Sequence, residues 1–224
     1  MVELRRDIDP EVVRENLARV RAEIAEAGRR AGDVEVLAAV KYVSVQELPA
    51  LAEAGLTLLG ENRAQDLLAK SDALPGRFTW DFIGQLQSRR VPLLLGRVRL
   101  IHSVASESVL AQLGRRSAGD QRVLVEVNVS GEPGKAGVMP AELGAFIERC
   151  PAPVEGLMTM PPRVERPEEN RRHFAALREL AERHGLHQLS MGTTQDYPAA
   201  LREGATIIRL GTTLFDPPGP ARRP

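Results

Sequence analysis

Short apolar runs alternate with amphipathic stretches along almost the whole chain. The first run, Val34–Val40, is apolar apart from Glu35, and such a run is typical of a strand buried on both faces. Seven further runs end near glycine, proline or polar residues. They predict strands over residues 56–59, 78–83, 99–103, 122–129, 154–159, 188–190 and 205–210.

The stretches before and between these runs predict helices. Apolar residues recur at helical spacing from Val13 to about Ala31, and Asp9 and Pro10 are suited to begin that helix. After the first strand, Ser44-Val-Gln-Glu47 reads as a capping box in which Ser44 caps the next helix. Helices between strands are expected over residues 45–54, 66–70, 87–95, 106–116, 140–150, 167–184 and 196–203.

This strict alternation predicts an α/β fold with a parallel sheet, and eight strand–helix units close a barrel. A doubly wound open sheet is the alternative. It is disfavoured because no Gly-x-Gly-x-x-Gly turn follows the first strand and the units are too many for a flavodoxin-like order. We therefore predict a single (β/α)8 TIM barrel over residues 1–215 with an extra N-terminal helix. The Pro- and Gly-rich residues 216–224 are typical of a disordered tail.

Composition excludes several classes of function. Thirty basic residues balance thirty acidic ones, which argues against nucleic acid or an anionic membrane as partner. Cys150 is the only cysteine, which fits a reducing cytoplasm. The charged N-terminus and the lack of an apolar run of about 20 residues predict neither a signal peptide nor a membrane span. The four histidines and Cys150 lack zinc-ligand spacing, so no metal site is expected.

A parallel barrel brings the carboxyl ends of its strands to one rim, where two features suggest chemistry. The loops Ser190-Met-Gly192 and Gly211-Thr212 follow strands seven and eight, the recurrent phosphate site of this fold, although either could simply allow a tight turn. Lys41 ends the first strand in a chain with only three lysines, which suggests amine chemistry, although this stretch alone favours a solvated or ion-paired lysine in a loop. A lysine facing a phosphate pocket predicts pyridoxal 5′-phosphate held as a Schiff base.

Nine segments also carry a family resemblance. From about Val34 to Phe215 they resemble, in the same order, the pyridoxal phosphate homeostasis proteins of the YggS/PROSC type, which are single-domain barrels similar to the N-terminal domain of alanine racemase. The segments are Ala39-Val-Lys41, Gly60-Glu-Asn62, Phe82-Ile-Gly84-Gln-Leu-Gln87, His102-Ser-Val104, Val127-Asn128-Val, Lys135-Ala-Gly137, Gly156-Leu-Met158, Leu189-Ser-Met-Gly192 and Arg209-Leu-Gly-Thr212.

The resemblance implies a role for each matched site residue. Lys41 would form the Schiff base, Asn62 would lie near the cofactor ring, and Arg209 would face the pyridine nitrogen. The phosphate would be held by Ser190, Gly192, Gly211 and Thr212.

The chain departs from the family at two places. Asp81 stands where a histidine or similar residue is usual, and we assign it no role. Gly192-Thr193-Thr194 stands where Gly-Met-Ser is frequent, and threonine still offers a hydroxyl for phosphate. Lys135, in the loop after strand five, either contacts the cofactor or is solvated, with the solvated interpretation favoured.

An arginine at the pyridine nitrogen weakens the ring as an electron sink, which disfavours rapid turnover. The chain also lacks a second domain of the kind that gives racemases an opposite base, and Tyr42 and Tyr197 are expected to be packing or rim residues. We therefore predict a monomeric, cytoplasmic protein that buffers or delivers pyridoxal phosphate, with pyridoxal-phosphate-dependent apo-enzymes as candidate recipients. The alternatives are a weak amino-acid racemase or related enzyme, and a barrel enzyme acting on a sugar or nucleotide phosphate.

Overall fold

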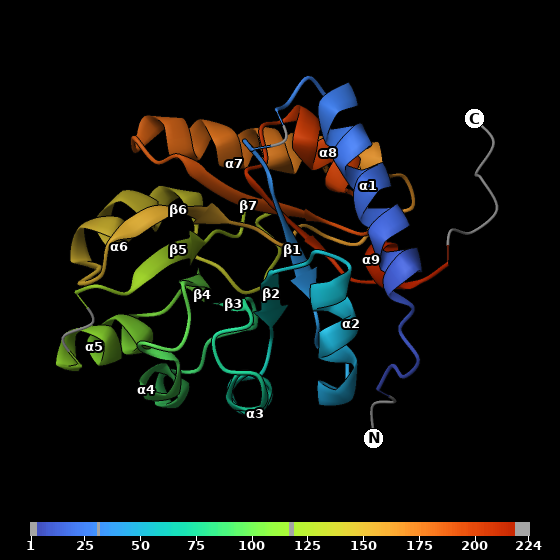
Figure 1. The fold of residues 1–224 in the computed structure, drawn as a ribbon. Helices are drawn as coiled ribbons and strands as arrows, with labels where there is room; N and C mark the ends of the chain where they lie inside the picture. Colours follow the sequence, from blue (N-terminus) through green and yellow to red (C-terminus); the bar gives the residue numbers. More distant parts are fainter. Residues whose placement is uncertain (1–3, 31, 117–118, 218–224) are drawn as a thin grey trace.

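The computed structural model describes residues 4–30, 32–116 and 119–217, and its strands form one closed parallel barrel in sequence order. β1 pairs with β2 on one side and with β8 on the other, which closes the ring seen in Figure 1. The predicted barrel is therefore confirmed. The strands are β1 Glu35–Ala39, β2 Leu58–Glu61, β3 Thr79–Phe82, β4 Leu100–Val104, β5 Arg122–Glu126, β6 Val154–Met158, β7 Gln188–Thr193 and β8 Ile207–Leu210.

Helices surround the barrel on its outer side (Figure 1). They are α1 Pro10–Glu26, α2 Leu48–Glu53, α3 Ala64–Ala73, α4 Val91–Leu94, α5 Glu107–Arg115, α6 Leu143–Arg149, α7 Arg171–Arg183, α8 Tyr197–Arg202 and α9 Thr212–Phe215. The predicted N-terminal helix, α1, packs against α2, α8 and α9. Because α9 is only one turn long, α1 takes the place in the outer ring that the helix after β8 would otherwise fill. No helix among the described residues has the length and apolar character needed to cross a bilayer.

Alternating side chains of the strands build two apolar layers. Leu37 of β1 points into the barrel, and its neighbour Ala38 points out toward the helices; neither is exposed to solvent. This confirms that the first strand is buried on both faces. The inner layer consists of Leu37, Leu100, Leu124, Met158 and Ile207. It lies below the carboxyl rim and leaves the upper interior to polar side chains.

Local details differ from the sequence-based expectations. The capping box was wrong, because Ser44 makes no capping hydrogen bond and Glu47 instead accepts one from the backbone N–H of Ile8, 2.7 Å away. The carboxylate of Glu47 therefore binds the N-terminal segment instead of closing back on Ser44. Asp9 does cap α1, accepting from the N–H of Glu11. Asp216 is held by Arg5 and Asn16, whereas residues 218–224 of the expected tail lie outside the described residues.

Candidate functional site

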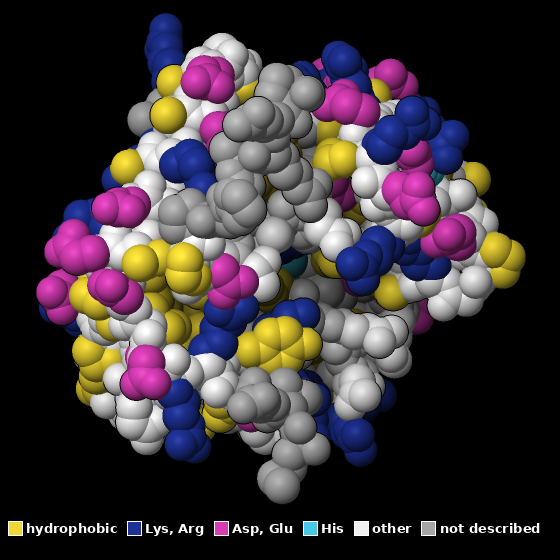
Figure 2. All heavy atoms as spheres, turned by 90° about the vertical axis from the view of Figure 1, so that its right-hand side faces the viewer, with side chains coloured by type: hydrophobic (Ala, Val, Ile, Leu, Met, Phe, Trp, Pro, Cys, Tyr) yellow, Lys and Arg dark blue, Asp and Glu magenta, His cyan; other side chains and the backbone are white. Residues whose placement is uncertain are grey.

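A cavity of about 570 Å³ opens at the carboxyl ends of the strands. Figure 2 looks at the molecule from the side on which α9 lies, and Lys and Arg side chains stand around a hollow there. The cavity wall includes five of the seven site residues expected from the sequence, which are Lys41, Asn62, Arg209, Gly211 and Thr212. They follow or belong to β1, β2 and β8, which are neighbours in the ring. Its volume lies within the range of roughly 300–1,000 Å³ that is usual for small-molecule sites.

Lys41 follows β1 and is exposed at the cavity. Its Nζ lies 4.8 Å from the centre of the Tyr42 ring, a second residue of the cavity wall. Lys70 and Lys135 are each paired with a carboxylate, but no carboxylate within the described ranges forms an ion pair with Lys41. Its amine is therefore available to react with a ligand in the cavity.

The position of Lys41 is fixed by a buried ion pair between Lys70 of α3 and Glu61 of β2. The Lys70 Nζ donates to Glu61 and, over 2.7 Å, to the backbone carbonyl of Val40, the residue before Lys41. The other carboxylate oxygen of Glu61 accepts from the backbone N–H of Asn62 at 2.6 Å. One pair thus holds the ends of β1 and β2, from which Lys41 and Asn62 reach the cavity. Sequence reasoning missed it, although Lys70 is one of only three lysines.

Arg209 lies at the cavity wall with 5% of its surface exposed. One terminal nitrogen donates to the backbone oxygen of Ser190 at 2.9 Å and to its hydroxyl at 2.6 Å. The other donates to the backbone oxygen of Thr159 at 2.9 Å and to the sulfur of Met160. Burial lowers the pKa of Arg209 to about 10, against the opposing influence of Glu126 and Asp196. The guanidinium is therefore still charged at neutral pH.

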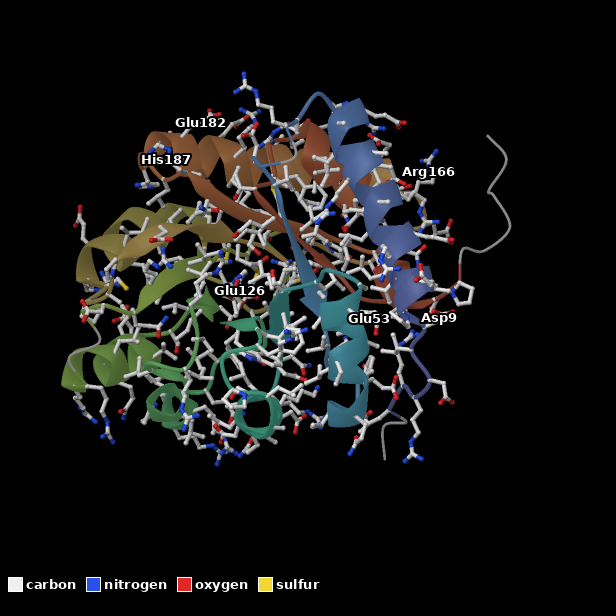
Figure 3. All side chains as sticks on the ribbon, in the orientation of Figure 1. Asp9, Glu53, Glu126, Arg166, Glu182 and His187 are labelled. Carbon is white, nitrogen blue, oxygen red and sulfur yellow. The ribbon has the colours of Figure 1, made fainter. Side chains whose placement is uncertain are left out.

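The hydrogen-bond partners of Arg209 are all uncharged. Its two terminal nitrogens have four N–H groups, which match the four acceptors, while its Nε–H has no partner among the described residues. Figure 3 places Glu126 of β5 within the ring of strands. Burial raises the pKa of the Glu126 carboxyl, although the positive charges of Arg209 and Lys135 act to lower it. Arg209 can therefore direct one donor and an unpaired positive charge toward a ligand.

The loops after β7 and β8 form the hydroxyl-bearing side of the cavity. Thr193 and Thr194 lie in the wall with Gly211 and Thr212. The Thr194 hydroxyl accepts from the backbone N–H of Gly211 at 3.4 Å, which joins the two loops. Asp196 fixes the first loop by accepting from the N–H of Thr193 at 2.8 Å. Hydroxyls and glycine backbone near a lysine provide donors for an anionic group.

The structure does not bring Ser190 and Gly192 to the cavity wall. The Ser190 hydroxyl lies inside the barrel, 2.8 Å from Nδ1 of His102. Gly192 has a φ of 89° and packs against α8, where an added Cβ would lie 2.6 Å from the Cβ of Ala200. Ser190 is thus engaged in hydrogen bonds inside the barrel, and Gly192 allows the close packing against α8. The next residues, Thr193 and Thr194, occupy the wall position that was expected for these two.

The remaining residues considered from the sequence lie at different places. Lys135 pairs with Glu132 and is outside the cavity wall. The Tyr197 hydroxyl donates to Glu23 of α1, so that Tyr197 packs a helix interface, whereas Tyr42 is a rim residue. The wall also contains Arg5, which the sequence did not single out, because its contact with the loop after β1 depends on the path of the N-terminal segment.

His102 is a completely buried histidine on β4 beneath this site. Burial lowers its pKa, and the nearby Asp81 offsets only part of this effect. In the unfolded chain His102 binds a proton more readily than in the folded protein. The contribution of neutral His102 to stability is therefore complete above the unfolded pKa of about 6.5 and is lost as pH falls below that value. We expect the free energy of unfolding to decline by up to about 1.4 kcal/mol per pH unit there.

Urea unfolding between about pH 5 and pH 7 measures this dependence. The variant His102→Phe serves as its control, because the unfolded chain then lacks the proton site in question. The assignment would be contradicted by the same slope in the variant and the parent protein.

Comparisons with known proteins identify similar sequences and similar folds. No protein-family model matches the chain. It is 41% identical over 219 residues to the pyridoxal phosphate homeostasis protein of Aquifex aeolicus, covering 90% of this chain and 96% of that protein. PipY of Synechococcus elongatus PCC7942, solved with pyridoxal phosphate bound, has a TM-score of 0.77 at 30% identity, covering 91% and 99% of the two chains. Alanine racemase from Corynebacterium glutamicum shares the fold with a TM-score of 0.72 at 18% identity, covering 100% of this chain and 66% of that one.

Proposed function

We infer that this chain, which belongs to the family of pyridoxal phosphate homeostasis proteins, binds pyridoxal 5′-phosphate, holds it as a Schiff base on Lys41 and buffers or delivers it. The observation that carries the proposal is one cavity with the Lys41 amine, the Arg209 guanidinium and the glycine–threonine loops in its wall. Among the residues that the structure describes, Lys41 forms no ion pair. The alternative hypothesis, a barrel enzyme acting on a sugar or nucleotide phosphate, leaves Lys41 without a role.

The residues of the cavity fit the chemical groups of this cofactor. Its phosphate requires neutral or positive donors, which the hydroxyls of Thr194 and Thr212 offer on one side, and Gly211 between them has no side chain to block the approach. Its aromatic ring requires apolar contact, and the wall also contains Ile83 and Met160. The Nε–H of Arg209 is available to the ring nitrogen, and Asn62 provides an amide beside Lys41. We propose these residues as the binding set, with Thr193 and Thr194 in place of Ser190 and Gly192.

The proposed covalent step is a condensation. The cofactor supplies an aldehyde carbon; the Lys41 amine adds to it, and one water leaves with the carbonyl oxygen and both amine protons as the C=N bond forms. Lys41 can carry out this addition because no carboxylate in the described part of the chain pairs with its amine. Tyr42 lies against the lysine chain and limits where the amine can point.

The environment of the ring nitrogen favours a carrier. A carboxylate there would keep the nitrogen protonated and make the ring a strong electron sink, whereas the Arg209 guanidinium can only donate to an unprotonated nitrogen. Charge developing on a bound amino acid would therefore receive little stabilisation. We propose binding and release as the main activity, with apo-enzymes that need the cofactor as recipients.

The purified protein mixed with pyridoxal phosphate should be yellow, and borohydride reduction should leave a pyridoxyl group on the peptide that contains Lys41. Absorbance and peptide mass spectrometry measure the two effects. A colourless protein with an unmodified Lys41 peptide would refute the covalent proposal.

The racemase alternative is tested by deuterium exchange at the α-carbon of small amino acids in heavy water. For a carrier we expect exchange far below the roughly 1 s⁻¹ at which typical enzymes begin. Exchange above that rate, lost on replacement of Lys41, would make the protein an enzyme.

Thr212→Val should weaken cofactor affinity by roughly ten- to 150-fold, because a hydrogen bond to a charged group contributes about 1.5–3 kcal/mol. Thr213→Val is the matched control, since Thr213 lies next to the cavity but outside its wall. Absorbance titration measures both variants. Equal affinities would remove Thr212 from the binding set.

A further inference from the structure

A chain of polar side chains crosses the inside of the barrel and ends at Arg209. Ser190 accepts from Arg209 at 2.6 Å, and its hydroxyl lies 2.8 Å from Nδ1 of His102. The Nε2 of His102 lies 3.1 Å from Asp81, which receives two hydrogen bonds from Arg99 at 2.9 and 2.6 Å. His102, Ser190 and Asp81 are almost completely shielded from solvent. We call Asp81, His102 and Ser190 the interior relay.

The donors and acceptors of the relay determine its direction. Asp81 stays ionised, because hydrogen bonds from His102 and Arg99 outweigh burial and lower its pKa. The carboxylate only accepts, so His102 must place a proton on Nε2. The neutral imidazole then accepts at Nδ1, and the Ser190 proton is committed to it. Ser190 therefore presents lone pairs, and no proton, to Arg209.

The far end of the relay is anchored away from the cavity. Arg99 precedes β4 and also donates to Glu35 at the start of β1. Arg99 already provides a counterion and two hydrogen bonds for the Asp81 carboxylate. The hydrogen bond between Asp81 and His102 is therefore a third one. The structure contains a negative charge at one end of the relay and the Arg209 cation at the other, joined only through neutral groups.

We propose that Asp81, His102 and Ser190 are positioning residues that hold the Arg209 guanidinium so that its Nε–H is presented to the ring nitrogen of the cofactor. The hydroxyl of Ser190 fixes one terminal nitrogen of Arg209. Its orientation depends on His102, and the tautomer of His102 depends on Asp81. This inference rests on the proposed function and extends it to residues outside the cavity wall.

Substitutions in the interior relay should change the hydrogen bond at the ring nitrogen of the cofactor more than they change the fold. In Ser190→Ala the Arg209 nitrogen keeps the backbone oxygen of Ser190 but loses the hydroxyl. In His102→Phe the ring volume stays, but Ser190 is free to turn its proton toward Arg209. Asp81→Asn is the mildest change, because its amide oxygen can still accept from Arg99 while the negative charge is removed.

The test uses the full-length protein loaded with pyridoxal phosphate labelled with ¹⁵N in the ring. For Ser190→Ala and His102→Phe we expect the ¹⁵N resonance to move from its parent position toward that of the free, unprotonated cofactor, with an affinity loss of roughly tenfold. Asp81→Asn should move it in the same direction by less. His187→Phe is the control, since His187 is exposed at the outer edge of the barrel in Figure 3 and should leave the resonance unchanged.

A purely structural relay gives a different result. Variants that bind the cofactor, have the parent circular dichroism spectrum and show an unchanged ring resonance would overturn the positioning role. If His102→Phe fails to fold, Ser190→Ala and Asp81→Asn decide between the two. Failure of the parent protein to bind the labelled cofactor would refute the proposed function itself, and is distinguished because it appears without any substitution.

Discussion

Replacing Lys41 with arginine is expected to abolish covalent capture of pyridoxal phosphate while leaving the fold intact. Arginine keeps the positive charge and a side chain of similar length, but its guanidinium stays protonated and cannot add to an aldehyde. Because Lys41 is exposed and forms no ion pair within the described residues, the substitution leaves no buried group unpartnered. The yellow colour should be lost, and the mass increase after borohydride should fall to the background level.

Lys135→Arg is the control for Lys41→Arg. Lys135 is the other lysine that the sequence suggested as a cofactor contact, and it already pairs with Glu132. It should retain the full label on Lys41. Label that remains in Lys41→Arg and disappears in Lys135→Arg would move the covalent site to the loop after β5. Phosphate-dependent, reversible binding should survive in Lys41→Arg, because Thr212 and Arg209 are unchanged, and dialysis should then remove the cofactor completely.

The barrel could be predicted because it is encoded by repetition. Eight apolar runs separated by helical stretches leave few ways to bury both faces of each strand, and a run such as Val34–Val40 fixes its own burial. Caps are less predictable, since they depend on competition between partners. Ser44 and Glu47 have the right spacing for a capping box, but Glu47 meets the backbone of Ile8 instead. Only the path of the N-terminal segment decides this.

The candidate site was predictable where it consists of strand ends and less so where side-chain direction matters. Lys41, Asn62 and Arg209 follow from their places along the strands. Ser190 alternates along β7 with Leu189 and Met191, which pack in the apolar layer between strands and helices, so strand alternation was a signal that the Ser190 side chain points into the barrel. The partnership of Asp81 with His102 joins β3 to β4 and has no local pattern in the sequence.

Removing the amine of Lys70 is expected to cause the largest loss of stability of any single change considered. Lys70 and Glu61 have only 6% and 0% of their side-chain surfaces exposed. In Lys70→Met the carboxylate of Glu61 keeps its backbone donors but loses its counterion. A buried charge left without its partner costs about 3–5 kcal/mol. The urea concentration at half-unfolding of the cofactor-free protein measures this cost.

Two further variants separate the buried charge from the loss of packing. Lys135→Met removes a partly exposed pair with Glu132 and should cost less than about 1 kcal/mol. The double variant Lys70→Met, Glu61→Gln replaces the carboxylate with an amide whose oxygen can still accept from the backbone N–H of Asn62, and should recover much of the lost stability. If Lys70→Met lowers the free energy of unfolding as little as Lys135→Met does, the stabilising role proposed for the buried Lys70–Glu61 pair is wrong.

The same double variant separates stability from site geometry. It restores a neutral interior but not the hydrogen bond that Lys70 donates to the Val40 carbonyl, one residue before Lys41. If that bond positions the reactive lysine, the double variant should fold well yet form the Schiff base more weakly than the parent protein. Absorbance titration with pyridoxal phosphate measures this difference. Parent-like affinity in the stable double variant would limit Lys70 to the fold and leave the orientation of Lys41 to Tyr42 and the end of β1 alone.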